Sequence, residues 1–164
     1  MIRYKPGYSK FLFLYNKNMK KTNHNHFIQL AISEAKKGIQ SKHGGPYGCV
    51  IVKNNKVIAK SHNKVSLKND VTSHGEMETI RLACKKLKTF NLMGCTLYTT
   101  AYPCPMCVAA CKWAHIKKVY YGCTEADTQA IDSEDKKFYN AKLETTCVGR
   151  KECLQLFKQF KNKK

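Results

Sequence analysis

The chain has 164 residues, 43% of them hydrophobic, which is enough for one domain with a buried core and too short for two domains of ordinary size. No apolar stretch reaches the length of a membrane span, so we expect no membrane-spanning helix. The nine cysteines are irregularly spaced and no secretion signal precedes them, so we expect a reduced, cytoplasmic protein rather than a secreted disulfide scaffold.

The formal net charge of +19 raises the question of a nucleic-acid ligand, because clustered lysine and arginine neutralise phosphates. Of the 30 basic residues only Arg3, Arg81 and Arg150 are arginines, so side chains suited to bidentate recognition of phosphates and bases are scarce. The lysines are spread through every segment. We therefore favour a solvated basic surface and keep nucleic-acid binding as the less favoured alternative.

The first predicted helix marks the start of the folded domain. Residues 1–21 are basic and aperiodic, and we predict a disordered extension there, followed by a single domain over residues 22–164. Thr22 or Asn23 can cap a helix whose apolar residues recur at helical spacing, and Gly38 is the expected stop signal.

The next predicted elements are a β-hairpin and a second helix. Two β runs surround Asn54 and Asn55, which tolerate the positive φ of a tight turn. After a polar loop, the segment from His74 to Leu87 carries apolar residues on one helical stripe.

A strand–helix–strand unit follows. A strand is predicted over residues 95–100, then a helix that begins near Pro105, and then a strand over residues 117–123. Such a unit implies a parallel strand pair with a right-handed crossover. Residues 130–140 indicate a short helix or an irregular connection, and residues 151–164 indicate an amphipathic helix.

The stretch "PCPMC" carries the first chemical signal. Cys104 and Cys107 are three residues apart across a helix start, so both sulfurs point the same way and the positive end of the helix dipole favours thiolates. The spacing fits metal ligands and also fits a redox pair. A second helix start supplies His74 in "HGE", and one imidazole with two thiolates makes three protein ligands for zinc.

Glu76 adds a mechanism to this metal site. Two residues after His74, its carboxylate can lie beside a zinc-activated water without binding the metal, and can carry protons to a substrate nitrogen. Cys111 is the alternative fourth ligand, which would make the site a closed structural one; it lies a full turn deeper in the helix. The remaining cysteines are expected in the core, and the remaining histidines are not expected to bind metal: Cys49, Cys84, Cys95, Cys123, Cys147, Cys153, His24, His26, His43, His62 and His115.

The pairing of "HGE" with "PCPMC" resembles the signature of the cytidine/deoxycytidylate deaminase superfamily, the zinc nucleobase deaminases. Four stretches covering most of residues 44–139 are most similar to the bacterial-type guanine deaminases: "GGPYGCVIVKNNKVIA", "HNKVSLKNDVTSHGEMETIR", "LYTTAYPCPMC" and "YYGCTEADTQAIDSEDKKFY". The resemblance implies an α/β fold, a three-layer α/β/α sandwich around a five-stranded mixed sheet.

The resemblance also implies roles for further residues. Asn63 is expected to hydrogen-bond the purine, and Asp135 to contact its exocyclic amino group; the alternatives from the residues alone are turn capping and a solvated acidic face. Two positions depart from the family pattern, Tyr102 in place of glutamate and Gly75 in place of alanine. A homodimer is expected, although the C-terminal segment is shorter than the segment that closes the partner's active site in the bacterial enzymes.

The sequence therefore predicts a Zn²⁺-dependent hydrolytic deaminase that converts guanine to xanthine and ammonia, with no membrane partner. The first alternative is a tRNA-specific adenosine deaminase, which shares the metal site and would use the basic surface to hold RNA around a flipped adenine. The second is a non-catalytic zinc-stabilised binding protein, whose sign would be a fourth protein ligand.

Overall fold

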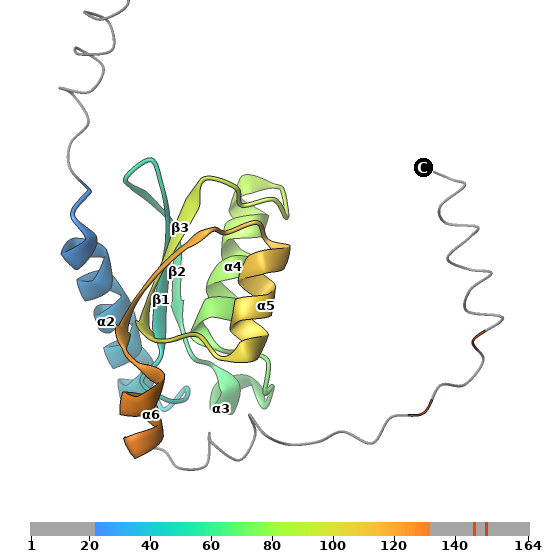
Figure 1. Cartoon of the computed structure of the whole chain (residues 1–164). Coiled ribbons are helices and arrows are strands. Elements are labelled where there is room, and N and C mark those ends of the chain that lie inside the picture. Colours follow the sequence, from blue (N-terminus) through green and yellow to red (C-terminus); the bar gives the residue numbers. More distant parts are fainter. Residues whose placement is uncertain (1–21, 132–145, 147–149, 151–164) are drawn as a thin grey trace, which may run out of the picture. The chain divides into compact units, whose positions relative to one another are not determined.

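The computed structural model describes residues 22–131, 146 and 150. Figure 1 shows the elements in chain order: α2 (His24–Gln40), β1 (Gly48–Lys53), β2 (Lys56–His62), α3 (Val65–Lys68), α4 (Gly75–Leu87), β3 (Cys95–Ala101), α5 (Pro105–Trp113), β4 (Lys118–Cys123) and α6 (Glu125–Ile131). The predicted extension and the predicted C-terminal helix lie outside the described residues, so the single domain over residues 22–164 stays a prediction.

One mixed sheet with the strand order β2-β1-β3-β4 organises the fold. β1 runs antiparallel to both β2 and β3, whereas β3 and β4 are parallel, as the strand–helix–strand unit predicted. The expected fifth strand is wrong for the described residues, which form four. After β4 the chain turns at once into α6, where Thr124 and Asp127 cap each other's backbone N–H groups in a reciprocal capping box that favours a helix.

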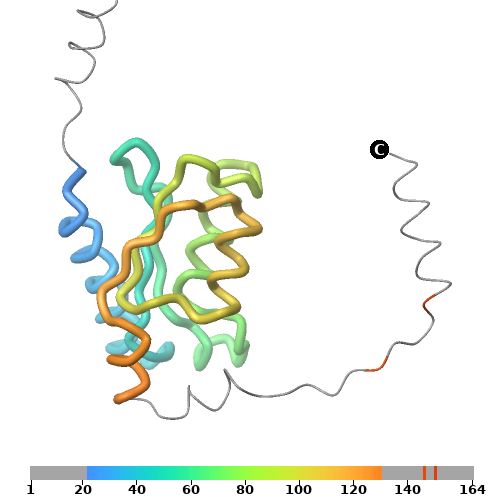
Figure 2. The backbone as a smooth tube through the Cα atoms, viewed as in Figure 1, coloured from blue at the N-terminus to red at the C-terminus, as the bar shows by residue number. Residues whose placement is uncertain are grey.

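Helices cover both faces of this sheet, with α2 on one side and α4 and α5 on the other (Figures 1 and 2). β1 supplies both cores because successive side chains of a strand point to opposite faces. Val50 and Val52 pack in a cluster with Phe27 of α2, and Cys49 and Ile51 pack in the larger cluster beneath α4 and α5. The described residues thus form the three expected layers.

Local signals explain most element boundaries. The Asn23 side chain accepts a hydrogen bond from the His26 N–H and caps α2, and Asn54 and Asn55 have φ values of 50° and 59° in the hairpin turn. Gly38 does not end α2, which continues to Gln40. An added Cβ at Gly38 would lie 2.7 Å from the His62 ring, so this glycine allows close packing instead.

Of the helices in the described part of the chain, none combines the length and the apolar character that crossing a membrane requires.

Candidate active site

The starts of α4 and α5 carry the predicted metal ligands. His74 and Cys104 are the N-cap residues of these two helices, and both have the extended backbone conformation usual at that position. Cys107 lies on the first turn of α5 and is fully buried. The positive ends of two helix dipoles therefore meet at this place, which favours thiolates.

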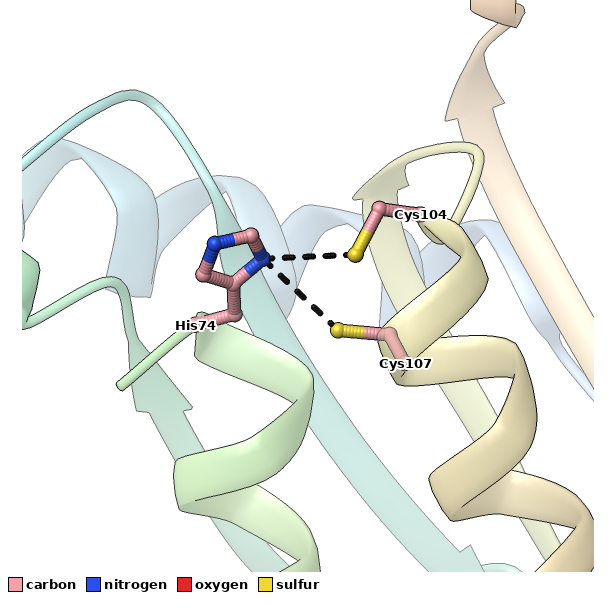
Figure 3. Close-up of side chains that lie close together, drawn as sticks. All are labelled: His74, Cys104 and Cys107. Atoms are coloured by element: carbon pink, nitrogen blue, oxygen red, sulfur yellow. Dashed lines mark hydrogen bonds between the residues drawn. The ribbon is translucent and has the colours of Figure 1, made fainter. Parts of the chain in front are cut away.

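The three side chains converge, as Figure 3 shows. The His74 Nδ1 atom lies 3.5 Å from the Cys104 Sγ atom and 3.8 Å from the Cys107 Sγ atom, and all three ligand atoms lie within 4.8 Å of one another. Zinc–sulfur bonds of about 2.3 Å and zinc–nitrogen bonds of about 2.0 Å at tetrahedral angles require nitrogen–sulfur separations of about 3.6 Å. The side chains therefore fit zinc without rearrangement.

The two thiols differ strongly in their affinity for a proton. A hydrogen bond from Cys107, assisted by His74 and opposed by burial, lowers the pKa of the Cys104 thiol to about 4. The same bond, together with burial, raises the pKa of Cys107, which keeps the proton. Zinc binds cysteine as thiolate, so metal binding at this place displaces the proton of Cys107.

Glu76 lies buried beside the three ligands, with 4% of its surface exposed. Its Oε2 atom accepts a hydrogen bond from the Cys107 thiol at 3.6 Å, and its Oε1 atom accepts one from the Thr99 hydroxyl at 2.7 Å. Burial raises the pKa of the Glu76 carboxyl, and the bond from Thr99 opposes that shift. The carboxylate is thus held by the sheet and faces the side chains of His74, Cys104 and Cys107, which together are called the metal group.

Asn63 directly follows β2 and is 5% exposed. Its backbone N–H donates to the carbonyl of Tyr47 at 2.8 Å, and its side-chain oxygen accepts a hydrogen bond from the N–H of Val65 at 3.0 Å. The turn-capping alternative for Asn63 is therefore present in the structure, and the same bond fixes the amide plane.

The structure also shows where the other cysteines and histidines within residues 22–131 lie. Cys111 is buried but does not belong to the metal group, and none of the other histidines within residues 22–131 belongs to it. Cys123 is exposed rather than in the core, whereas Cys49 and Cys95 are buried as predicted. Tyr102 is 46% exposed and packs edge-on against Tyr121, with ring centroids 5.1 Å apart. The following predicted residues lie outside the described part of the chain: Asp135, Cys147 and Cys153.

Comparison with known proteins decides the family. The profile for the cytidine and deoxycytidylate deaminase zinc-binding region matches residues 21–123, and this range holds the three converging ligands and Glu76. The chain belongs to this deaminase family. Because the chain is a family member and its three metal-binding side chains converge, this deaminase is a zinc-dependent hydrolytic enzyme.

Several relatives of this deaminase are known. It is 41% identical to the guanine deaminase of Bacillus subtilis over 117 residues, and this aligned stretch covers 71% of this chain and 75% of the relative. It is also 41% identical to a tRNA-specific adenosine deaminase of Agrobacterium fabrum over 108 residues, and this aligned stretch covers 66% of this chain and 70% of the relative. The crystal structure of the Bacillus subtilis guanine deaminase superposes with a TM-score of 0.77 at 35% identity and covers 85% of this chain and 94% of that one.

Sequence reasoning missed two polar residues near this deaminase's metal group. Thr99, which holds Glu76, belongs to β3 and is fully buried. The available signal was a threonine in the same alternation as the apolar Cys95 and Leu97, which places it on the inward face of the strand. Glu78 is buried on α4, one helical turn after His74. Its signal was the repetition of acidic residues at positions 76 and 78 in a chain that is otherwise strongly basic.

Proposed function

We propose that this deaminase converts guanine to xanthine and ammonia, with zinc held by His74, Cys104 and Cys107. The observation that carries the proposal is the similarity to the Bacillus subtilis guanine deaminase. The two structures superpose over 94% of that chain, and the two sequences are 41% identical over 117 aligned residues. The tRNA-specific relatives match shorter stretches or match with lower overall coverage of this chain.

Zinc, when bound, polarises water so that it becomes a nucleophile near neutral pH. Glu76 moves the protons: its carboxylate accepts one from the attacking water and delivers it to the ring nitrogen beside the amino-bearing carbon. It then accepts the second proton from the hydroxyl group newly attached to that carbon and delivers it to the leaving amine, which departs as ammonia. The bond from Thr99 to Glu76 Oε1 leaves Oε2 directed toward the metal group. One carboxylate oxygen is thus fixed while the other carries the proton.

Recognition of the purine is assigned to Asn63 and Asp135. The Asn63 side-chain oxygen already accepts a hydrogen bond from Val65, so its amide nitrogen is the group that donates to a purine acceptor. A carboxylate at position 135 would accept hydrogen bonds from the exocyclic amino group and help it to leave. Both roles rest on the family resemblance, as does the homodimer, whereas the cytoplasmic location rests on the irregular cysteine pattern.

The direct test is ammonia release from the full chain with guanine, adenine, cytosine, their nucleosides and tRNA. We expect activity with guanine and a shallow salt dependence between about 50 and 200 mM, because a neutral base releases no counterions on binding. tRNA adenosine deaminase activity is the second candidate, favoured by the identity to the Agrobacterium fabrum relative and by the net charge of +19. Activity on tRNA alone, with affinity falling by orders of magnitude over that salt range, would establish it instead.

Variants separate the metal site from the proton carrier. Cys104→Ala and Cys107→Ala should lose zinc, whereas Cys95→Ala, at a buried cysteine of the core, should keep it. Glu76→Gln should keep zinc and lose turnover by orders of magnitude, because the amide cannot carry protons. Stoichiometric zinc in both ligand variants would refute the ligand assignment, and near-normal turnover of Glu76→Gln would remove Glu76 from the mechanism.

A further inference from the structure

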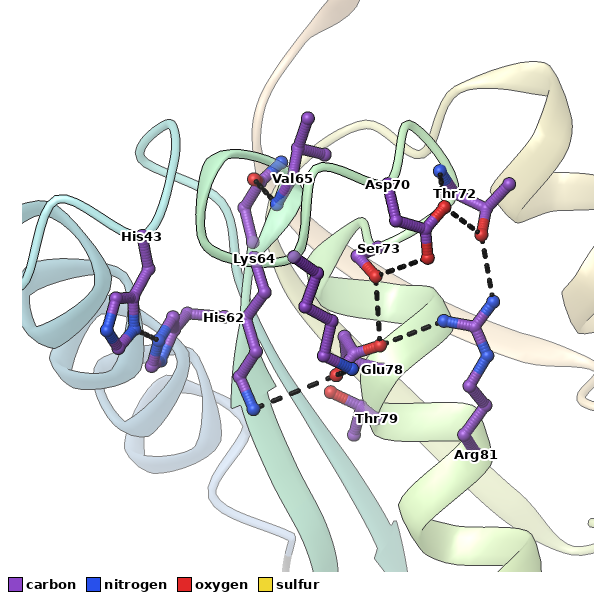
Figure 4. Close-up of polar contacts among 12 residues, drawn as sticks. His43, His62, Lys64, Val65, Asp70, Thr72, Ser73, Glu78, Thr79 and Arg81 are labelled. Carbon is purple, nitrogen blue, oxygen red and sulfur yellow. Dashed lines mark hydrogen bonds and ion pairs between the residues drawn. The ribbon is translucent and has the colours of Figure 1, made fainter.

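A second buried carboxylate lies close to the active site but does not contact the metal group. Glu78 is on α4, four residues after His74, and is 5% exposed. Its carboxylate points toward the segment of residues 64–73, which connects Asn63 to His74 (Figure 4). This connecting segment contains the short helix α3 and is called the loop below. Burying a carboxylate is costly unless charged and polar groups compensate it, so its partners show what the burial achieves.

Three cations and one hydroxyl surround Glu78. Its Oε2 atom accepts a hydrogen bond from the Lys68 Nζ atom at 2.7 Å and lies 3.7 Å from the Lys64 Nζ atom. Its Oε1 atom accepts one from Arg81 at 2.8 Å and lies 3.3 Å from the Ser73 hydroxyl. Burial raises the pKa of Glu78, but the hydrogen bonds from Lys68 and Arg81 outweigh it and hold the pKa below its usual range. The group is therefore ionised at neutral pH.

The same loop is tied to itself next to these contacts. The carboxylate of Asp70 accepts hydrogen bonds from the N–H and the hydroxyl of Thr72, both at 2.8 Å, and from the Ser73 hydroxyl at 2.7 Å. Arg81 donates to the Thr72 hydroxyl at 3.0 Å, and the Lys64 N–H donates to the Ser73 carbonyl at 2.8 Å. The two ends of the loop are thus bonded together, and α4 holds the loop through Arg81 and Glu78.

The ends of this loop are the neighbours of two functional residues. Lys64 follows Asn63, and Ser73 precedes His74. We infer that Glu78 is a positioning residue: it gathers the loop of residues 64–73 onto α4 and thereby fixes Asn63 for the substrate and His74 for zinc. The roles of Asn63 and His74 in this statement rest on the proposed function.

The exposure of the partners distinguishes this role from general stabilisation. The side chains of Lys64, Lys68 and Arg81 are 25%, 44% and 47% exposed, so water solvates them when the carboxylate is lost. Removing the charge of Glu78 therefore costs little in the core and mainly releases the loop.

Glu78→Gln in the full chain tests this, because glutamine keeps the volume and loses the charge. We expect amide hydrogen exchange within residues 64–73 to accelerate about tenfold while α2 is unchanged. We also expect the affinity for zinc, measured by competition with a chelator, to fall by about 10- to 100-fold, the range found when groups that orient metal ligands are altered. The KM for guanine should rise more than kcat falls.

Two further variants serve as controls. Glu34→Gln removes a carboxylate of similar burial, bonded to Lys37 and Lys60 on the α2 side of the sheet, and should leave zinc affinity unchanged. Lys68→Gln changes an exposed partner and should reproduce part of the Glu78→Gln effect, with less than additive loss in the double variant.

Zinc affinity and loop exchange of Glu78→Gln within about twofold of wild type would overturn the inference, as would an equal loss of zinc affinity in Glu34→Gln. If the wild-type chain does not act on guanine but the zinc and exchange effects occur, the positioning role stands and only the proposed substrate fails.

Discussion

The hydrogen bond from Thr99 to Glu76 allows a quantitative test of how the proposed catalytic carboxylate is held. Thr99 is fully buried, and its hydroxyl donates to Glu76 Oε1 at 2.7 Å. Thr99→Val keeps the shape of the side chain and removes this donor. A hydrogen bond to a charged group contributes about 1.5–3 kcal/mol, and every 1.4 kcal/mol corresponds to about tenfold in rate. If the bond fixes Glu76 for proton transfer, kcat should fall about 10- to 150-fold.

Thr99→Ser is the matched control. It keeps the hydroxyl and removes one methyl group, which costs about 1 kcal/mol of stability through the small cavity that it leaves. We expect its kcat to stay within severalfold of wild type, whereas both variants should retain zinc because Thr99 lies outside the metal group. The measurements are ammonia release at saturating guanine and metal content. Normal turnover in Thr99→Val, or equal losses in both variants, would refute the reasoning.

Three further outcomes follow from the structure. Gly48→Ala would place a Cβ 2.0 Å from a carbonyl oxygen of α2, so we expect the free energy of unfolding to fall by about 3 kcal/mol and the melting temperature by about 10 °C. The control Gly94→Ala, whose nearest contact is 3.8 Å away, should lose only about 1–2 kcal/mol because of its positive φ. Equal losses in the two variants would contradict this prediction. Glu34 and Glu78 have lowered pKa values in the folded chain, so the stability that they contribute is present above the unfolded pKa and is lost as the pH falls through the folded pKa. The free energy of unfolding, measured by chemical denaturation, should therefore decrease between about pH 5 and 3, and this decrease should be smaller in Glu78→Gln. Removing zinc with a chelator should lower the melting temperature in proportion to the binding free energy, and an unchanged transition would show that the metal is not held in the native state.

Local signals in the sequence were sufficient for the metal ligands. His74 and Cys104 each stand at a helix start, and the apolar spacing after them predicts where α4 and α5 lie. The hairpin turn at Asn54 and Asn55 is equally local, because positive φ depends on the residue itself. These features need no knowledge of distant contacts. The structure confirms the two helix starts and the hairpin turn, and it brings His74 and Cys104 close to each other.

The features that sequence reasoning missed depend on contacts between distant segments. Gly38 looks like a helix end, but it is a packing position whose neighbour, His62, is 24 residues away in sequence. α3 has only four residues and no side-chain cap, so no periodic pattern marks it. Thr99 and Glu78 are polar groups whose burial is possible only because partners on other segments reach them.

The topology explains why these residues meet. β2 and β3 are both antiparallel to β1, so they run in the same direction as each other, and β4 is parallel to β3. Their C-terminal ends therefore lie at one edge of the sheet, where open α/β sheets bind ligands. Asn63 follows β2 at this edge, and Cys104 follows β3. This edge carries a predicted metal ligand and the proposed purine-binding residue on strands separated by β1. The segment of residues 64–73, held by Glu78, connects that edge to His74. Changes at Glu78 should therefore affect metal and substrate together, whereas changes at Thr99 should affect proton transfer alone.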